Sequence, residues 1–564
     1  MKSSKIYDHY YNYEEITKIV HEYAEKYPSL ARLSSLAVSK EGRDTWLIEV
    51  TDTSKGGYSE KPAYFLNGHV HAGEVTGSMC AMYFLDCLFS NMDESEEIKK
   101  LLETTTFYVI PRPVPDGAEY YLTHPDTLRS VNEPYPFFDE MPGLVPGDLD
   151  GDGAVRTMLV ESPYGAWKKA EEDPRVLVKR KPDEVGGVFY NVYSEGSING
   201  YDGVNVFPAP AKFGLDLNRN FPVGWETGNK QAGSGFAPGD RQESQTLIQF
   251  VQGHPNICNT ITFHTFSGIY LYPPGMFPKK SADPDDMKRY ELITKIAQEE
   301  TGFVPMNIKD DFLGDFVAKT SGSFEDFLHF GHGIYCYTVE TWDLAHQAGI
   351  ELHFPDPFGL SDEKMKENAL KFYEWVDKNG FGSYIKPWTA IDHPQLGKVE
   401  IGGPDPKRII QNPPVELIQQ EVEKHTRFIL RHAKTMPHLV FRQAAAEKIS
   451  DGVYRVDAYI YNSGFMPTHI LNEYKSLGFS KDITVELEGE GLTFVEGSQK
   501  QKIGQLEGFS GAKTDYFYFG IVTNKHDPIE KKVSWIVKAA APATLKVSAW
   551  SERAGVASAE VTLA

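Results

Sequence analysis

The chain has 564 residues and a formal net charge of -22, with 24% charged, 41% apolar and 13% aromatic side chains. At about 100 to 200 residues per domain, this length predicts two to four folded domains with ample core. The composition excludes disorder, collagen and coiled coil as the dominant state. The acidic excess argues against nucleic acid or a membrane surface as the main partner, because both carry negative charge.

The four cysteines and the N-terminal segment indicate the cellular compartment in which the protein is expected. The N-terminal segment has no apolar run after its lysines and does not resemble a signal peptide. The longest apolar stretch, 79–89, is interrupted by Asp86 and is shorter than the roughly 20 residues of a membrane span. We expect a cytoplasmic protein, with a secreted mature form as the alternative. Irregularly spaced cysteines inside apolar segments are typical of buried thiols in reducing compartments: Cys80, Cys87, Cys258 and Cys336.

The first two thirds of the chain alternate between helical and strand patterns. Apolar residues recur at three- and four-residue steps from Tyr13 to Tyr27, which predicts an amphipathic helix that ends before Pro28. This alternation predicts a layered α/β domain with a mostly buried sheet. Strands are expected from Thr45, Ala63 and Thr106 onward and over 257–266 and 334–341, and helices near 74–90, 288–300 and 364–378.

The last part of the chain follows another pattern. The domain boundary is placed in the Pro- and Gly-rich stretch after Pro387, and 389–436 is expected to be a linker with a helix from Pro414 to Arg431. Apolar and polar residues then alternate with a period of two, as in 453–461 and 545–549. This alternation with turn residues between the runs predicts an antiparallel β-sandwich domain over 437–564.

One segment concentrates polar side chains at the end of a predicted strand, from Asn67 to Glu74. A His and a carboxylate three residues apart at a strand-to-helix turn, as in His71 and Glu74, can bind one Zn²⁺ from the same side. The pattern is frequent by chance. A polar loop in which Glu74 simply starts a helix is the alternative explanation.

Further motifs follow in chain order, and together they carry a family resemblance. They are Val114-Pro115-Asp116-Gly117, Asp216-Leu217-Asn218-Arg219-Asn220-Phe221, Phe263-His264-Thr265-Phe266-Ser267 and Val339-Glu340-Thr341. With this ordered set, the sequence from Tyr7 to Gly380 resembles the zinc carboxypeptidases of the carboxypeptidase A type, the M14 metallopeptidases. The resemblance implies a carboxypeptidase-like α/β/α layered catalytic domain with a mixed sheet over 1–388, interrupted by an insert at about 130–210.

The resemblance implies one Zn²⁺ per chain, bound by His71, Glu74 and His264. Two His and one Glu are the ligands of carboxypeptidase A, and they leave a coordination position open for water. One negative charge among three ligands leaves the ion net positive, enough to polarise a carbonyl and to lower the pKa of water. His69 is the rival first ligand; the spacing favours His71 and makes His69 a hydrogen-bonded loop residue.

The resemblance also assigns the catalytic and substrate-binding side chains. Glu340 matches the general base that moves a proton from the attacking water to the leaving amine. Asn218 and Arg219 match the pair that holds the terminal carboxylate of the substrate, for which a planar guanidinium is suited. Arg129 resembles the arginine that stabilises the developing oxyanion. Arg156, or a plain surface role for Arg129, is the alternative.

Three positions depart from the family pattern. Val114 stands where an Asn is common, and Ala318 and Phe266 stand where tyrosines are frequent. A phenolic donor is therefore expected to be missing from the site, with Tyr335 or Tyr337 as candidate substitutes.

Substrate preference is indicated by one residue. By the same resemblance, Glu325 falls in the pocket that binds the side chain of the substrate's terminal residue. An acidic residue at the floor of this pocket favours a C-terminal Lys or Arg. A loop carboxylate turned to solvent is the alternative.

The insert contains alternating aspartates, Asp148, Asp150 and Asp152, before Gly153. This pattern resembles the first half of an EF-hand-type Ca²⁺ loop, although position twelve is Leu159 rather than Glu. A partial Ca²⁺ site and a plain acidic turn remain alternatives.

The sequence thus favours a zinc-dependent metallocarboxypeptidase, a hydrolase that acts on peptide or protein C-termini. A zinc amidase or deacylase acting on modified, cell-wall or polyglutamate peptides is the second hypothesis. A catalytically silent peptide-binding protein with the same fold is the third, and the presence of Glu340 argues against it because binding alone needs no base. The sequence does not indicate an oligomeric state.

Overall fold

The computed structural model describes residues 2–315, 317, 320–357, 359–511, 513–516, 522–525 and 528–564. Ala318, one of the two positions expected to lack a tyrosine, lies outside the described residues.

An eight-stranded mixed sheet forms the centre of the molecule, in the order β1-β2-β4-β3-β11-β14-β12-β13. The strands are β1 (Ala31–Val38), β2 (Asp44–Val50), β3 (Ala63–Asn67), β4 (Thr106–Ile110), β11 (Ile257–Thr265), β12 (Ile269–Tyr272), β13 (Val304–Asn307) and β14 (Tyr335–Thr341). The four central strands, β4, β3, β11 and β14, run parallel. Strands covered on both faces read as continuous apolar runs, and β3, β4 and β11 are buried along their whole length.

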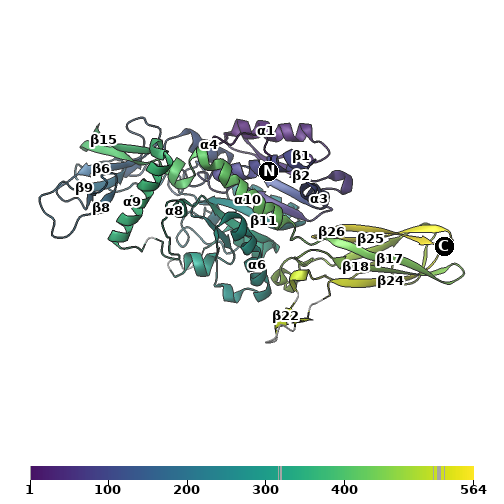
Figure 1. The fold of residues 1–564 in the computed structure, drawn as a ribbon. Helices are drawn as coiled ribbons and strands as arrows, with labels where there is room; N and C mark the ends of the chain where they lie inside the picture. The colour runs from purple at the N-terminus through teal and green to yellow at the C-terminus, as the bar shows by residue number, and fades with distance from the viewer. Residues whose placement is uncertain are drawn as a thin grey trace.

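Helices cover both faces of this sheet (Figure 1). On one face lie α1 (Tyr13–Lys26), α2 (Thr76–Asn91), α3 (Glu96–Thr104), α6 (Pro284–Thr301) and α10 (Ile418–Ala433). On the other face lie α5 (Gln242–Gly253) and the helical turn that begins with α7 (Phe324–Asp326). The predicted layered α/β fold with a mixed sheet is confirmed.

Local signals explain where individual helices begin. Asn12 accepts a hydrogen bond from the backbone of Glu15, and the Glu15 side chain bonds back to the Asn12 amide, so that a capping box starts α1. The helix expected from Pro414 begins at Ile418, because 415–417 form a separate 3-10 turn.

The insert forms a separate six-stranded sheet at one end of the molecule, together with a hairpin from later in the chain (Figure 1). Its order is β15-β16-β6-β9-β7-β8, and β5 pairs with β10 beside it. The strands are β5 (Gly143–Pro146), β6 (Thr157–Glu161), β7 (Trp167–Lys169), β8 (Leu177–Lys179), β9 (Tyr190–Ser194), β10 (Gly196–Asn199), β15 (Ile385–His393) and β16 (Gly397–Pro404). Helix α9 (Asp362–Asn379) lies between this sheet and the central part.

The expected linker is part of these layers. The boundary placed near residue 388 falls inside β15, and the 389–436 segment supplies β16 to the insert sheet and α10 to one face of the central sheet. The sequence pattern missed this because β16 pairs with β6 through contacts such as Glu400 with Leu159, far apart in the chain.

Residues from Leu439 onward form two four-stranded antiparallel sheets at the opposite end of the molecule (Figure 1). Their orders are β17-β18-β24-β20 and β21-β19-β25-β26. The strands are β17 (Leu439–Ser450), β18 (Val453–Asn462), β19 (Thr484–Glu488), β20 (Thr493–Glu496), β21 (Lys500–Lys502), β24 (Glu530–Lys538), β25 (Ala543–Ser551) and β26 (Gly555–Leu563), and a separate pair consists of β22 (Lys513–Tyr516) and β23 (Val522–Lys525). One apolar cluster joins the two sheets, and it contains the alternating residues of β18 and β25 predicted to share a face.

The four cysteines are buried thiols, as predicted. Across the ranges that the structure describes, no helix combines the length and the hydropathy required to cross a bilayer.

A buried arginine of the C-terminal sheets forms hydrogen bonds with the region around the central sheet. Arg553 is only 7% exposed, and its guanidinium donates hydrogen bonds to the carbonyls of His332, Gly333 and Pro255. It also lies over the ring of Tyr474, 5.0 Å from the centroid. Burial lowers the pKa of this guanidinium, but an arginine remains charged under all ordinary conditions.

We expect Arg553→Ala to lower the free energy of unfolding of the C-terminal sheets by about 2–4 kcal/mol, since buried carbonyls lose their donors. Calorimetry of the full chain should show an earlier transition. Arg442, whose exposed side chain pairs with Glu530, provides the matched control. Equal midpoints for Arg553→Ala and Arg442→Ala would show that Arg553 does not fasten the two parts.

Candidate metal centre and active site

Three buried side chains converge on one point, two from the turn after β3 and one from the end of β11. The Nδ1 of His71 lies 2.9 Å from Glu74 Oε2 and 3.0 Å from His264 Nδ1, and His264 Nδ1 lies 2.9 Å from the same Glu74 oxygen. A tetrahedral Zn²⁺ with bonds of about 2.0–2.2 Å separates its ligand atoms by about 3.3 Å, so the three atoms need only a small outward shift. The donor set and its spacing fit zinc.

His71 and Glu74 lie in the tight turn between β3 and α2, and glycines make this turn possible. A Cβ on Gly77 would lie 1.8 Å from the carbonyl oxygen of Gly68, so only glycine allows α2 to start this close to the end of β3. This packing places His71 and Glu74 on one side of the turn.

His69, the rival ligand, is held elsewhere in the same turn. Its Nδ1 lies 2.9 Å from the His71 carbonyl oxygen, and its Nε2 lies 2.9 Å from Ser78 Oγ. Burial lowers the pKa of His69 to about 3, so the ring is neutral. With both ring nitrogens in hydrogen bonds, His69 is not placed among the converging ligand atoms.

Carboxylates face the outer nitrogen of each ligand imidazole. Asp216 Oδ1 lies 3.1 Å from His71 Nε2, and Glu325 Oε1 lies 3.9 Å from His264 Nε2. A carboxylate at hydrogen-bonding distance, as Asp216 is, fixes the tautomer and orientation of a metal-binding histidine. The distance to Glu325 is too long for a hydrogen bond, and among the described residues His264 Nε2 has no hydrogen-bond partner. Burial raises the pKa of Asp216, but Arg129 and His71 outweigh it and hold that pKa well below its usual range.

Two supporting residues were missed by the sequence reasoning. Asp216 opens the motif that contains Asn218 and Arg219, and its position in that motif does not by itself indicate a contact with His71. Asn412 donates from Nδ2 to the Gly73 carbonyl at 2.8 Å and accepts from the Thr76 hydroxyl at 2.8 Å, so it braces the ligand turn. No local signal marks Asn412, because its partners lie more than 300 positions earlier.

Glu340 is placed beside the metal centre by strand pairing. β11 and β14 are parallel and in a register that sets Glu340 opposite His264, so both side chains leave the sheet on the same side. Burial raises the pKa of Glu340 well above its usual range; Glu74 adds to this effect and Arg129 opposes it. The structure thus brings Glu340 beside His264 and close enough to Glu74 for the two carboxylates to affect each other.

Arg129 reaches the same centre from the loop after α4 (Pro115–Thr123). Its guanidinium donates to Glu74 Oε1 at 3.3 Å and to Asp216 Oδ2 at 3.0 Å. The side chain remains 46% exposed, which leaves donors free for a ligand. The alternative, Arg156, is bound in the insert by Asp152 and the Gly403 carbonyl.

Asn218 and Arg219 lie on the short turn after Asp216. Asn218 is buried, donates to Glu325 Oε1 at 3.2 Å and accepts from the Phe324 amide at 2.7 Å. Arg219 is partly exposed and donates to the Asn218 carbonyl at 2.5 Å.

Glu325 is buried, with 2% of its surface exposed, which rules out a carboxylate turned to solvent. It accepts hydrogen bonds from Asn218 and from the hydroxyl of Thr338. These contacts and its proximity to His264 give it a positioning role; its part in substrate preference stays a prediction.

The suggested tyrosine substitutes do not reach the site. Tyr335 and Tyr337 are fully buried, and their hydroxyls donate to backbone carbonyls of α6, those of Asp286 and Tyr290. Side chains alternate along a strand, so these rings leave β14 on the face opposite to Glu340. Phe266 is 42% exposed beside Glu340 in a pocket.

The calcium prediction is not supported. Lys386 bonds to Asp150 at 2.5 Å and to Asp152 at 2.9 Å, and Arg156 also bonds to Asp152. Asp148 accepts from the backbone amides of Gly151 and Gly153, as in an acidic turn. Cations of the chain itself thus occupy two of the three carboxylates.

Comparison with known proteins agrees with the geometry. The sequence model of the M14 peptidase family, described as "Zinc carboxypeptidase", matches residues 16–369. A second, described as "Domain of unknown function (DUF8731)", matches residues 438–562.

Among curated relatives, Carboxypeptidase B of Astacus astacus is 33% identical over 346 residues, which are 60% of this chain and 88% of the relative. Carboxypeptidase D of Mus musculus is 26% identical over 111 residues, so the match spans 20% of this chain and only 8% of that protein. The crystal structure of thrombin activatable fibrinolysis inhibitor (TAFI) is similar at a TM-score of 0.40 and 15% identity, over 67% of this chain and 77% of the other.

Proposed function

The chain belongs to the zinc carboxypeptidase family, and from this premise we propose that it is a zinc-dependent metallocarboxypeptidase that hydrolyses the C-terminal peptide bond of peptides. The observation that carries the proposal is the convergence of His71, Glu74 and His264, with Glu340 in register beside His264. A silent binding protein would have no use for a partly buried carboxylate at that place.

His71, Glu74 and His264 would hold the ion, with Asp216 orienting the His71 imidazole. When bound, zinc supplies a Lewis acid that polarises the scissile carbonyl and lowers the pKa of water. The remaining steps fall to side chains of the chain.

Glu340 acts in this proposal as general base and then as general acid. Its raised pKa suits a carboxylate that takes a proton from the attacking water and returns it to the leaving amine. Arg129, partly exposed beside Glu74, would donate to the oxygen on which negative charge develops.

Asn218 and Arg219 would bind the terminal carboxylate of the substrate. Arginine offers two parallel donors to a carboxylate, and Arg219 has exposed surface for this contact. We further propose that Glu325 favours a terminal Lys or Arg, since its buried carboxylate lies against Asn218.

We also propose that residues 437–564 form a β-sandwich accessory module. The shared apolar cluster of the two antiparallel sheets supports it, and the buried Arg553 supports a role in stabilising the catalytic part.

A panel of peptides that end in Arg, Phe or Glu, each with a free and an amidated C-terminus, tests the substrate assignment. We expect amidation to lower kcat/KM by about 100-fold or more, because the charge-assisted hydrogen bonds to Arg219 are lost. Arg219→Ala should reduce this discrimination to a few-fold. Arg408→Ala, at an exposed arginine, should leave it intact.

The outcomes separate the hypotheses. Turnover that amidation does not change would favour the amidase or deacylase alternative over a carboxypeptidase. Equal rates on peptides that end in Arg, Phe and Glu would remove the proposed preference for basic residues without affecting the rest.

A further inference from the structure

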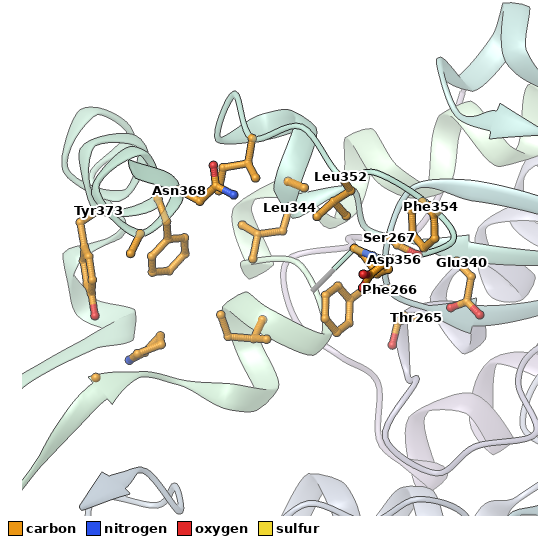
Figure 2. A pocket seen from close by; sticks show the side chains of 18 of the residues that line it. Thr265, Phe266, Ser267, Glu340, Leu344, Leu352, Phe354, Asp356, Asn368 and Tyr373 are labelled. Atoms are coloured by element: carbon orange, nitrogen blue, oxygen red, sulfur yellow. The ribbon is translucent and has the colours of Figure 1, made fainter. Parts of the chain in front are cut away.

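A mainly apolar chamber opens beside Glu340 and extends away from the metal centre. Its volume is about 880 Å³, within the roughly 300–1,000 Å³ of small-molecule sites. Figure 2 shows Glu340 and Thr265 at one end of the chamber and Asn368 and Tyr373 at the other. Apolar side chains from α8 (Leu344–Gln347), the loop after it and α9 line the space between them, among them Leu344, Leu352, Phe354 and Phe372.

The insert sheet supplies another wall of this chamber. Val176, Leu177 and Trp388 line it, and so does Arg175. The charge of Arg175 is already paired, because its guanidinium bonds to Asp173 at 2.7 Å and to Asp377 at 2.6 Å. The insert and its partner hairpin therefore enclose an apolar space that begins at the proposed general base.

On the premise of the proposed carboxypeptidase activity, we propose that this chamber binds the acyl-side segment of peptide substrates and selects bulky apolar side chains there. The residues proposed to hold the terminal amino acid, Asn218, Arg219 and Glu325, are not among the described residues that line the chamber. A substrate held by those residues presents its acyl side to the Glu340 end. The space beyond Glu340 is then filled by upstream residues.

Asn368 points to a peptide rather than a plain hydrocarbon as the occupant. Its Oδ1 is buried and, among the described residues, has no hydrogen-bond partner. A buried acceptor without a partner destabilises the protein unless a bound molecule supplies a donor. A backbone N–H of an upstream residue supplies one, whereas an alkyl chain does not.

Kinetics on matched peptides test the chamber. The peptides share the C-terminal residue and the glycine that precedes the scissile bond. They differ in the two residues before that glycine, which are either Gly-Gly or Leu-Phe. Each buried methylene contributes about fourfold to binding, so we expect the Leu-Phe peptide to have a kcat/KM at least about 50-fold higher. A third peptide, in which a decanoyl chain replaces Leu-Phe, compares a hydrocarbon of similar bulk.

Two variants fill the chamber from two different helices. Ala345→Trp on α8 and Ala369→Trp on α9 should each reduce the ratio of kcat/KM for the Leu-Phe peptide to that for the Gly-Gly peptide to below about fivefold. Both should leave kcat/KM for the Gly-Gly peptide unaffected. Glu374→Trp, on the exposed side of α9, is the matched control and should keep the full ratio.

A binding measurement separates this proposal from the proposed activity. Calorimetric titration with the acyl-side product, an acetylated Leu-Phe-Gly acid, needs no turnover, and Ala369→Trp should weaken its binding at least tenfold. Product binding of this kind without hydrolysis of any peptide would support the chamber and overturn the peptidase function. Hydrolysis with equal rates for all upstream residues, or a ratio that neither tryptophan changes, would overturn the chamber. A decanoyl peptide that equals Leu-Phe would overturn the choice of a peptide occupant.

Discussion

Glu340→Gln is expected to lower kcat by about 10²–10⁴-fold while zinc content stays unchanged. Glutamine keeps the shape of the side chain but cannot accept the proton from water or return it to the leaving amine. Glu340 is set beside His264 by strand register and is not one of the three converging ligand atoms, so its loss should leave the metal centre intact. Peptide kinetics together with zinc analysis of the same preparation measure both effects.

Asp356→Asn is the matched control for this substitution. Asp356 lines the same chamber as Glu340, but no register places it beside a metal ligand. It should retain turnover within a few-fold of the wild type. Full activity of Glu340→Gln, or an equal loss in Asp356→Asn, would remove Glu340 from the role of general base.

The strands that carry the site were predictable because each is a buried apolar run that ends in polar residues. β3, β4, β11 and β14 all lie where the pattern placed them. The register between β11 and β14 was not predictable, since the composition of neither strand specifies which residue lies opposite Glu340. Strand alternation alone would have excluded Tyr335 and Tyr337. They lie an odd number of residues before Glu340, so their side chains point to the opposite face of the strand.

Long-range pairing explains the errors. The aspartates of the insert look like a cation loop when read locally, but Lys386, 236 positions after Asp150, supplies the positive charge. The hairpin that carries Lys386 also completes the insert sheet, and most of this hairpin falls within 389–436, the segment expected to be a linker with a helix. Asn412 braces the ligand turn without any local signal. Partners that are brought together only by the fold cannot be identified from one segment of sequence.

Loss of a metal ligand should abolish both zinc binding and hydrolysis. We expect His71→Ala to bind zinc at least about 100-fold more weakly than the wild type, because removal of an outer-shell partner alone costs 10- to 100-fold. Zinc titration against a chromogenic chelator measures the affinity without relying on turnover. Wild-type protein stripped by a chelator should recover its activity when zinc is restored.

His69→Asn distinguishes the two candidate ligands in the turn. The His69 ring bonds to the His71 carbonyl and to Ser78, and an asparagine side chain can keep one of these contacts. Zinc affinity should then fall by less than about tenfold, through the small displacement of the turn. If His69→Asn lost the metal while His71→Ala kept it, the assignment of the first ligand would be reversed. Loss in His71→Ala alone would establish that the converging Nδ1 and Oε2 atoms form the binding site.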